Sequence, residues 1–291
     1  MSAIARTLGV ARSNLLVQAR RKPGASLALG TRSDRSRGCG RRDGRQEADA
    51  ELLAELRPFI DERTTYGYRR AGGILNRQRR SGGQKPVNHK RVYRVMREAG
   101  LLLARHTGKP TRTHDGKIIT LKSNLRWCSD GFEIRCWNGE RLQVAFSLDC
   151  CDREVMAFVA TTGAITGELV RDLMAQSIEH RFGPEARRAP GRIEWLSDNA
   201  PCYTAQETRE FGESIGMAIC TTPAYSPEST GMAECFVKGF KRDYVYVNRL
   251  DTAESVTREL AAWFADYNEV RPHQALKYLS PKEYRSQTST G

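Results

Sequence analysis

Apolar and polar positions follow two different patterns along this chain of 291 residues, and the change falls near residue 123. Before that point, apolar residues recur every three or four positions, as they do on one face of a helix. After it, short strand-like apolar runs alternate with helical segments. We therefore predict helical segments in the first part of the chain and an α/β domain over residues 123–291.

Three strand-like runs open the predicted α/β domain. The first two are RWCSDGFEIRCW and RLQVAFSLDC, and they flank Asn138-Gly139, a dipeptide that favours a tight hairpin turn. EVMAFVATT is the third strand, and Thr166 then caps a helix. The predicted apolar face of that helix consists of Leu169, Leu173, Met174 and Ile178. IEWLSDN and MAICTT add two strands with a helix between them, and two more helices follow. Three antiparallel strands followed by strand–helix units predict a ribonuclease H-like α/β fold.

Small all-α modules and linkers are predicted before this domain. Residues 49–104 have a helix-turn-helix pattern, in which Asn88 can cap the last helix. Residues 1–21 show a shorter helix-turn-helix-like pattern, for which a small packing helix is the alternative. Residues 22–48 are rich in Gly, Ser and Arg, and residues 105–122 are polar and basic. Neither composition can bury a core, so we predict a flexible basic linker and a second linker.

Basic residues are concentrated in the first part of the chain, whose overall net charge is +13. Residues 1–125 hold 28 of the 47 Lys and Arg residues but only 10 of the 34 Asp and Glu residues. This surplus indicates a polyanionic partner, and nucleic acid is the usual one. No apolar run approaches the roughly 18 residues of a membrane helix, and no signal-peptide pattern begins the sequence. We expect a cytoplasmic, nucleoid-associated protein with no membrane partner.

Three carboxylates stand where a metal site can form. Asp130 lies in the middle of the first strand, Asp198 at the carboxyl end of the fourth, and Glu234 near the start of a helix. Divalent cations prefer carboxylate oxygens, and two such ions can clamp the attacking and leaving oxygens of a phosphodiester. Asp149 is an alternative to Asp130, and Asp130 could also be a buried, hydrogen-bonded acid. A zinc module is not predicted, because there is no C-x-x-C pair and the five histidines are scattered.

Basic residues on two helices are candidate DNA contacts. Glu234, Lys238 and Lys241 are spaced to share one helix face, although an ordinary surface ion-pair ladder has the same spacing. Three arginines of the helix capped by Asn88 project away from its apolar face, where they can meet phosphates and base edges. A solvated helix face is the alternative for them. The predicted DNA-binding residues are Lys238, Lys241, Arg242, Arg91, Arg94 and Arg97.

The sequence resembles the integrase-type insertion-sequence transposases. It does so, in order, in WCSDGFE, LDCCDRE, LSDN, SPESTGMAE, FKRDY and YNEVRPHQALKYLSPKEY. It looks more narrowly like the catalytic protein from the second reading frame of such an element, over nearly the whole chain. The resemblance implies an integrase catalytic core with a DDE triad of Asp130, Asp198 and Glu234, which are the catalytic residues and the ligands of two Mg²⁺ (or Mn²⁺) ions. It also implies that Lys241 is the basic residue one helical heptad after the glutamate.

The same resemblance implies a function, namely metal-dependent cleavage and strand transfer at insertion-sequence ends. The expected partners are terminal-repeat and target DNA, further copies of the chain on that DNA, and an upstream-frame DNA-binding protein as fusion or partner. Two other functions remain open: a DNA-binding regulator with an inactive core, and a structure-specific nuclease that hydrolyses but does not join strands. Ala200, Thr230 and Gly239 stand where the family usually has Gly, Asn and Thr.

Overall fold

The computed structural model describes residues 39–103, 120, 122–221 and 227–288. The chain divides into two units, residues 1–47 and residues 48–291, and most of the described residues belong to the second. The predicted helix-turn-helix-like segment 1–21 lies outside the described residues, as does most of the predicted linker 105–122. No helix among the described residues has the length and apolar character that are needed to cross a bilayer.

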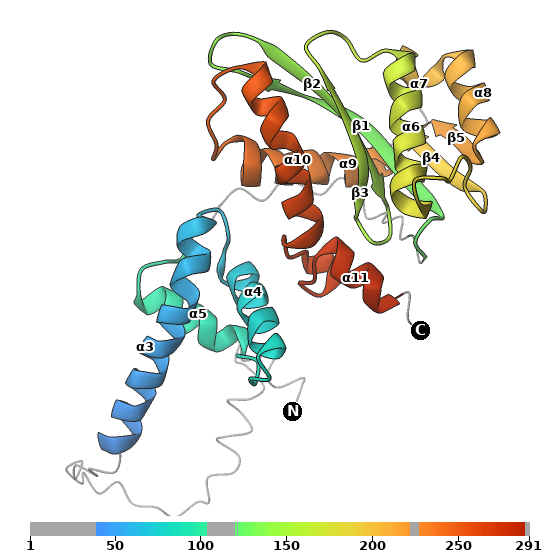
Figure 1. Ribbon diagram of the computed structural model, residues 1–291. Helices are drawn as coiled ribbons and strands as arrows, with labels where there is room; N and C mark the ends of the chain where they lie inside the picture. Colours follow the sequence, from blue (N-terminus) through green and yellow to red (C-terminus); the bar gives the residue numbers. More distant parts are fainter. Residues whose placement is uncertain (1–38, 104–119, 121, 222–226, 289–291) are drawn as a thin grey trace, which may run out of the picture. The chain divides into compact units, whose positions relative to one another are not determined.

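A mixed five-stranded sheet forms the centre of the second unit (Figure 1). Its strands are β1 (Arg126–Arg135), β2 (Arg141–Asp149), β3 (Val155–Thr161), β4 (Ile193–Ser197) and β5 (Met217–Thr221). The spatial order is β3-β2-β1-β4-β5, in which β1, β2 and β3 are antiparallel neighbours and β4 is parallel to both β1 and β5. The β1–β2 hairpin turns at Asn138-Gly139, where Gly139 has a φ of +90°. This topology confirms the predicted ribonuclease H-like α/β fold.

Three helices cover one face of the sheet. They are α6 (Gly167–Phe182), α7 (Pro201–Thr204) and α8 (Gln206–Ser214). Thr166 caps α6 as predicted, because its side chain accepts a hydrogen bond of 3.3 Å from the Leu169 backbone N–H. The buried apolar residues of α6 are Val170, Leu173, Met174 and Ile178, so Val170 replaces the predicted Leu169. They pack around Trp127 of β1, which is fully buried.

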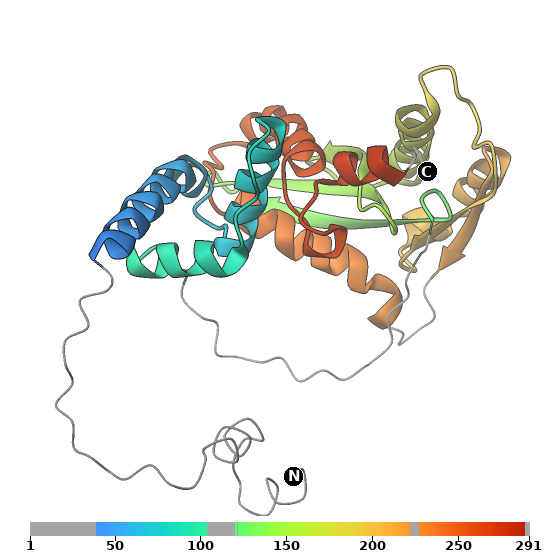
Figure 2. The ribbon, with the colours of Figure 1, turned by 90° about the horizontal axis from the view of Figure 1, so that it is seen from below.

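The opposite face is covered by two helices that carry many aromatic residues. These elements, with the short helices that follow them, are α9 (Pro227–Phe240), the π-helix η1 (Lys241–Val245), α10 (Ala253–Glu269), η2 (Gln274–Leu276) and α11 (Pro281–Thr288). The ring of Phe236 on α9 lies 4.3 Å from that of Phe146 on β2, and Phe240 lies 4.6 Å from Phe264 on α10. Such pairs add about 0.5–1.5 kcal/mol each beyond the burial of their area. They fix α9 beside the strands, as Figures 1 and 2 both show.

A separate apolar core holds the helices that precede the sheet. These are α3 (Cys39–Glu62), α4 (Tyr68–Ser81) and α5 (His89–Glu98). Asn88 caps α5 as predicted, and its side chain accepts a hydrogen bond of 2.9 Å from the Lys90 backbone N–H. Leu56, Leu75 and Val92 are among the residues buried between the three helices.

The helix α3 corrects one boundary of the predicted flexible linker 22–48. Residues 39–48 of that segment are helical and continue without a break into the packed part of α3. The segment contains Arg, Gln, Glu and Ala, which are good helix formers. Extending an existing helix costs much less than starting a new one, so a helix can continue into a segment whose composition alone predicts a linker.

Candidate active site

Asp130 and Asp198 point to the same face of the sheet. On β1, Cys128 and Phe132 belong to the core under α9, so Asp130 also points to that side. Cys128 pairs with Leu196 on the parallel strand β4, and Leu196 packs against the same core. Asp130 follows Cys128 by two residues, just as Asp198 follows Leu196. The strand alternation therefore brings the two aspartates to neighbouring positions on the face that α9 covers.

Glu234 reaches this region from α9, which packs against β1. Ala233 and Phe236 on either side of it are buried, whereas 52% of the Glu234 side chain is exposed. Its Oε2 accepts a hydrogen bond of 3.2 Å from Lys238 Nζ. The surface ion pair that the sequence leaves as an alternative is thus present, and Glu234 remains accessible from solvent.

The three carboxylates act on one another electrostatically. Burial raises the pKa of Asp130, and the negative charges of Asp198 and Glu234 raise it further. A hydrogen bond of 2.7 Å from the Gly131 backbone N–H opposes this rise. Asp198 in turn accepts a hydrogen bond of 3.0 Å from the Ala200 backbone N–H. A half-buried carboxylate with two acidic neighbours is poorly neutralised by the protein, and a cation would favour its ionised form.

The donor set fits a hard divalent cation, because it consists of three carboxylates with no sulfur or imidazole ligand. Among the described residues, no three acidic, His or Cys side chains are already arranged as a metal-binding group. Like charges repel when nothing neutralises them, and Glu234 is bonded to Lys238 instead. Binding an ion would require Glu234 to exchange this ion pair for the metal.

Lys241 and Arg242 begin the π-helix η1, directly after α9. The Lys241 ammonium lies 5.6 Å from the ring centroid of Phe132, two residues after Asp130 on β1. Because Phe132 and Asp130 point to the same side of β1, Lys241 lies on the side of the sheet that holds Asp130. Burial lowers the pKa of Lys241. Arg242 is half exposed and donates two hydrogen bonds, of 2.7 and 2.8 Å, to the adjacent Asp243.

Asp149, the alternative to Asp130, has a structural environment. It is fully buried at the end of β2 and accepts hydrogen bonds from the backbone N–H groups of Asn124 (2.7 Å) and Cys151 (2.7 Å). The indole N–H of Trp127 donates a third, of 3.1 Å, and Arg181 forms an ion pair of 3.4 Å. These partners hold the Asp149 carboxylate at the turn between β2 and β3, which it stabilises by accepting the hydrogen bond from Cys151.

The three arginines of α5 are not equivalent in the structure. Arg91 and Arg94 both bind Asp49 of α3, with N–O distances of 2.8 and 2.6 Å. Arg97 is exposed and forms no ion pair with a described residue. DNA contact by these side chains stays a prediction, and for the first two it requires a change of partner.

A buried cluster of charged residues around Asp243 was not predicted from the sequence. Asp243 of η1 has a side chain only 1% exposed and binds three guanidinium groups. Arg70 of α4 and Arg271 after α10 each lie 2.8 Å from it, and Arg242 lies 2.7 Å from it. Thr65 donates a further hydrogen bond of 3.0 Å. Arg242 and Asp243 occur in the FKRDY motif and Arg271 in the RPHQ motif, whereas Thr65 and Arg70 belong to neither, and nothing in the spacing shows that these residues meet.

We predict that Gly239→Ala destabilises the protein although alanine is the better helix former. A Cβ atom at Gly239 would lie 2.8 Å from Nη2 of Arg271, which Asp243 holds in place. Overpacking of this kind costs about 1–3 kcal/mol, which exceeds the ~1 kcal/mol gained in helix propensity. Urea denaturation should show a lower free energy of unfolding for Gly239→Ala than for the parent. The matched control is Gly231→Ala in the same helix, where a Cβ meets no atom within 4 Å and stability should rise.

Three family models match the chain. An integrase core domain matches residues 121–227, and a second model with the same description matches residues 215–281. A model described as an HTH-like domain matches residues 46–109, which include α4 and α5. The matched regions cover the sheet with its helices and the preceding helical module. The matches therefore define a protein with an integrase core domain that follows an HTH-like domain, the class of the polynucleotidyl transferases.

The curated relatives narrow this class. The chain is 46% identical over 250 residues to the transposase InsD for insertion element IS2A/D/F/H/I/K of Escherichia coli, which covers 85% of this chain and 82% of the relative. This chain therefore belongs to the insertion-element transposase family. Among solved structures, the catalytic core domain of BIV integrase matches 57% of this chain and 97% of its own, with 20% identity and a TM-score of 0.41. The HTLV-2 integrase catalytic core domain in complex with magnesium matches 57% of this chain and 99% of its own, with 15% identity and a TM-score of 0.42.

Proposed function

We propose that this chain catalyses metal-dependent cleavage and strand transfer at the ends of an insertion sequence, with Asp130, Asp198 and Glu234 as the catalytic carboxylates. The observation that carries the proposal is their convergence. Asp130 and Asp198 point to the face under α9, and Asp130 experiences the charges of both Asp198 and Glu234. Membership of the insertion-element transposase family supports the assignment of DNA as substrate.

The three carboxylates would hold two Mg²⁺ or Mn²⁺ ions. When bound, such ions supply an activated oxygen nucleophile and stabilise the charge on the leaving oxygen. The chain's own residues bind and orient the substrate. Lys241 is placed to contact a phosphate or base near Asp130, and Lys238 can leave Glu234 for a phosphate oxygen. Rates depend steeply on this positioning, because misplacement by about 1 Å can cost roughly a hundredfold.

The reaction has two chemically similar steps at one site. Water first attacks a phosphodiester at the element end, and the broken P–O bond leaves a free 3′-OH. That 3′-OH then attacks a phosphodiester of the target: a new P–O bond forms, one target P–O bond breaks, and the displaced 3′ oxygen takes up a proton. One phosphodiester replaces another, so the second step needs no external energy source.

DNA contacts outside the carboxylates belong to the same proposal. Lys238, Lys241 and Arg242 would contact the element end, and the arginines of α5 would contact its flanking repeat. We also propose that copies of the chain assemble on DNA, that an upstream-frame DNA-binding protein acts as fusion or partner, and that the protein works in the cytoplasm at the nucleoid.

A strand-joining assay tests the function. Labelled duplexes that carry the element ends are incubated with the full chain and target DNA, in Mg²⁺, in Mn²⁺ or in EDTA. We expect products that join end to target in either metal and none in EDTA. Cleavage without joining would indicate the nuclease instead. DNA binding with neither reaction, in both metals, would indicate the regulator with an inactive core.

A further inference from the structure

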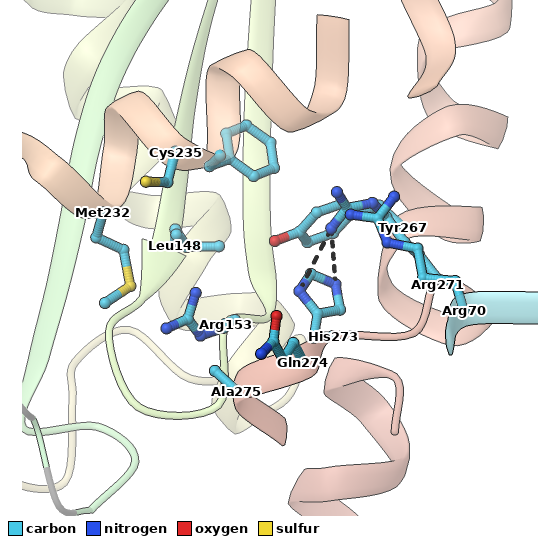
Figure 3. Close-up of a pocket in the computed structure, with 11 residues that line it drawn as sticks. Arg70, Leu148, Arg153, Met232, Cys235, Tyr267, Arg271, His273, Gln274 and Ala275 are labelled. Atoms are coloured by element: carbon cyan, nitrogen blue, oxygen red, sulfur yellow. Dashed lines mark hydrogen bonds between the residues drawn. The ribbon is translucent and has the colours of Figure 1, made fainter. Parts of the chain in front are cut away.

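A second candidate site lies beside α9, on a different side of that helix from Glu234. It is a pocket of about 470 Å³ that contains arginines from three parts of the chain (Figure 3). Met232 and Cys235 of α9 line it, whereas Glu234 points about 100° or more away from both, given 3.6 residues per turn. The pocket is therefore distinct from the carboxylate site, although one helix borders both.

The pocket has a surplus of positive charge. Arg70, Arg153 and Arg271 contribute to its lining, and none of the eleven lining residues that the structure describes is acidic. Arg70 and Arg271 both form ion pairs with Asp243, which also binds Arg242. One carboxylate thus faces three guanidinium groups there, and Arg153 adds a further charge.

Arg153 is the most available of these cations. It comes from the turn between β2 and β3, and it forms no ion pair or side-chain hydrogen bond with any residue that the structure describes. Figure 3 shows it entering the pocket, where Gln274 and His273 also lie. Its backbone has a φ of +62°, the left-handed region that arginine rarely adopts and that costs of order 1 kcal/mol or more.

The neighbouring histidine reports the same positive environment. His273 is 7% exposed, lies edge-on to the Tyr267 ring and contacts Arg271 Nη1 at 3.2 Å. Burial lowers its pKa to about 2, with further lowering by the charges of Arg271, Arg153 and Arg70. A neutral imidazole and the Gln274 amide can both donate a hydrogen bond to an oxyanion without adding charge.

We infer that this pocket binds a phosphate group of the DNA backbone, with Arg153 as its principal contact and Arg271, Gln274 and His273 as the surrounding donors. Guanidinium groups match phosphate oxygens in geometry and charge. The inference rests on DNA as the partner of this family but not on the carboxylate assignment. A strand that lies across the exposed side of α9 would then contact the protein on both sides of that helix.

The test uses variants that fit the backbone at position 153. Arg153→Gly and Arg153→Asn both tolerate a positive φ, so they should fold at least as well as the parent while removing the charge. The matched control is Arg187→Gln, which removes an exposed arginine that pairs with Glu179 at 3.3 Å outside the pocket. All measurements use the full chain in EDTA, so a failure of catalysis cannot affect them.

Two probes separate a free anion from a DNA phosphate. Inorganic phosphate, compared with chloride at equal ionic strength, should raise the melting temperature of the parent and of Arg187→Gln but not of the Arg153 variants. For a duplex of arbitrary sequence, log K for association falls as log salt rises, and this slope should be less steep by about 0.9 in the Arg153 variants because one phosphate contact is lost. The lost contact corresponds to about a tenfold loss of affinity at 0.1 M salt. The control should keep the parent's slope.

An unchanged salt slope in Arg153→Gly would overturn the inference. If the phosphate response were lost with the slope unchanged, the pocket would bind a small anion and the assignment to DNA would be wrong. If both substitutions lowered the melting temperature in chloride, Arg153 would be a structural residue, which would also overturn the assignment.

Discussion

Replacing Glu234 by glutamine should abolish strand joining while the fold and DNA binding remain. Glutamine has nearly the same volume and lacks the charge that would hold a divalent ion. The side chain is half exposed, and its hydrogen bond to Lys238 is a surface contact, so little stability depends on it. A bound ion contributes several kcal/mol to the transition state, and about 4 kcal/mol corresponds to roughly a thousandfold in rate. The measurement is the rate of strand joining at saturating end DNA.

Asp130→Asn and Asp198→Asn should give losses of the same order, because we propose that all three residues hold the same ions. Glu207→Gln is the matched control, since Glu207 is an exposed glutamate that pairs with Arg171 at 3.4 Å. Lys241→Ala should differ in kind: its loss should be partly rescued by excess end DNA, because an ammonium positions substrate and cannot bind a cation. Activity of Glu234→Gln near that of the parent would show that the triad is wrong, and Glu228 would become the next candidate.

Local sequence rules predicted well one hairpin of the sheet and the starts of two helices. Asn138-Gly139 fixed the first hairpin because its backbone suits a tight turn, and Thr166 and Asn88 fixed two helix starts because each accepts a free backbone N–H. These interactions involve residues within three positions of one another. They therefore depend little on the remainder of the fold, and the sequence alone contains them.

The relation between Asp130 and Asp198 was only partly predictable. The alternation of β1 shows that Asp130 shares a side with Cys128 and Phe132, and the sequence places Asp198 at a strand end. That β4 pairs with β1, with Cys128 opposite Leu196, depends on which strands become neighbours. The motif resemblance supplied this information in place of a physical derivation.

Ion pairs between distant segments could not be predicted at all. Arg91 and Arg94 were expected to face DNA, yet both bind Asp49, more than 40 positions earlier in the chain. A charged side chain on a helix can meet solvent, nucleic acid or a carboxylate of another helix, and periodicity does not distinguish these partners. The left-handed backbone of Arg153 could not be predicted either, because no glycine or asparagine stands at that position to indicate a positive φ.

Asp243→Asn should be among the most destabilising single substitutions in the described part of the chain. Asp243 is almost completely buried, and removing its charge leaves Arg70, Arg242 and Arg271 facing one another without a counter-ion. Breaking a buried ion pair by removing one partner costs about 3–5 kcal/mol. Urea denaturation at pH 7 measures the loss. Asp251→Asn is the matched control, because Asp251 is about half exposed and its single ion pair, with Arg249 at 3.2 Å, should contribute less than about 1 kcal/mol.

The pH dependence of this difference identifies its cause. Burial alone would raise the pKa of Asp243, but the hydrogen bond from Arg242 and the charges of Arg271 and Arg70 outweigh it and lower the pKa well below its usual range. A carboxyl whose pKa is lower in the folded state stabilises the fold fully above its unfolded pKa, and this stability is lost as pH falls through the folded pKa. The free energy of unfolding of the parent should therefore exceed that of Asp243→Asn by a constant amount from pH 7 down to about pH 5. This difference should become smaller below about pH 4. A gap that stayed constant into strong acid would mean that the asparagine disrupts packing, and that the charge of Asp243 does not hold the three arginines together.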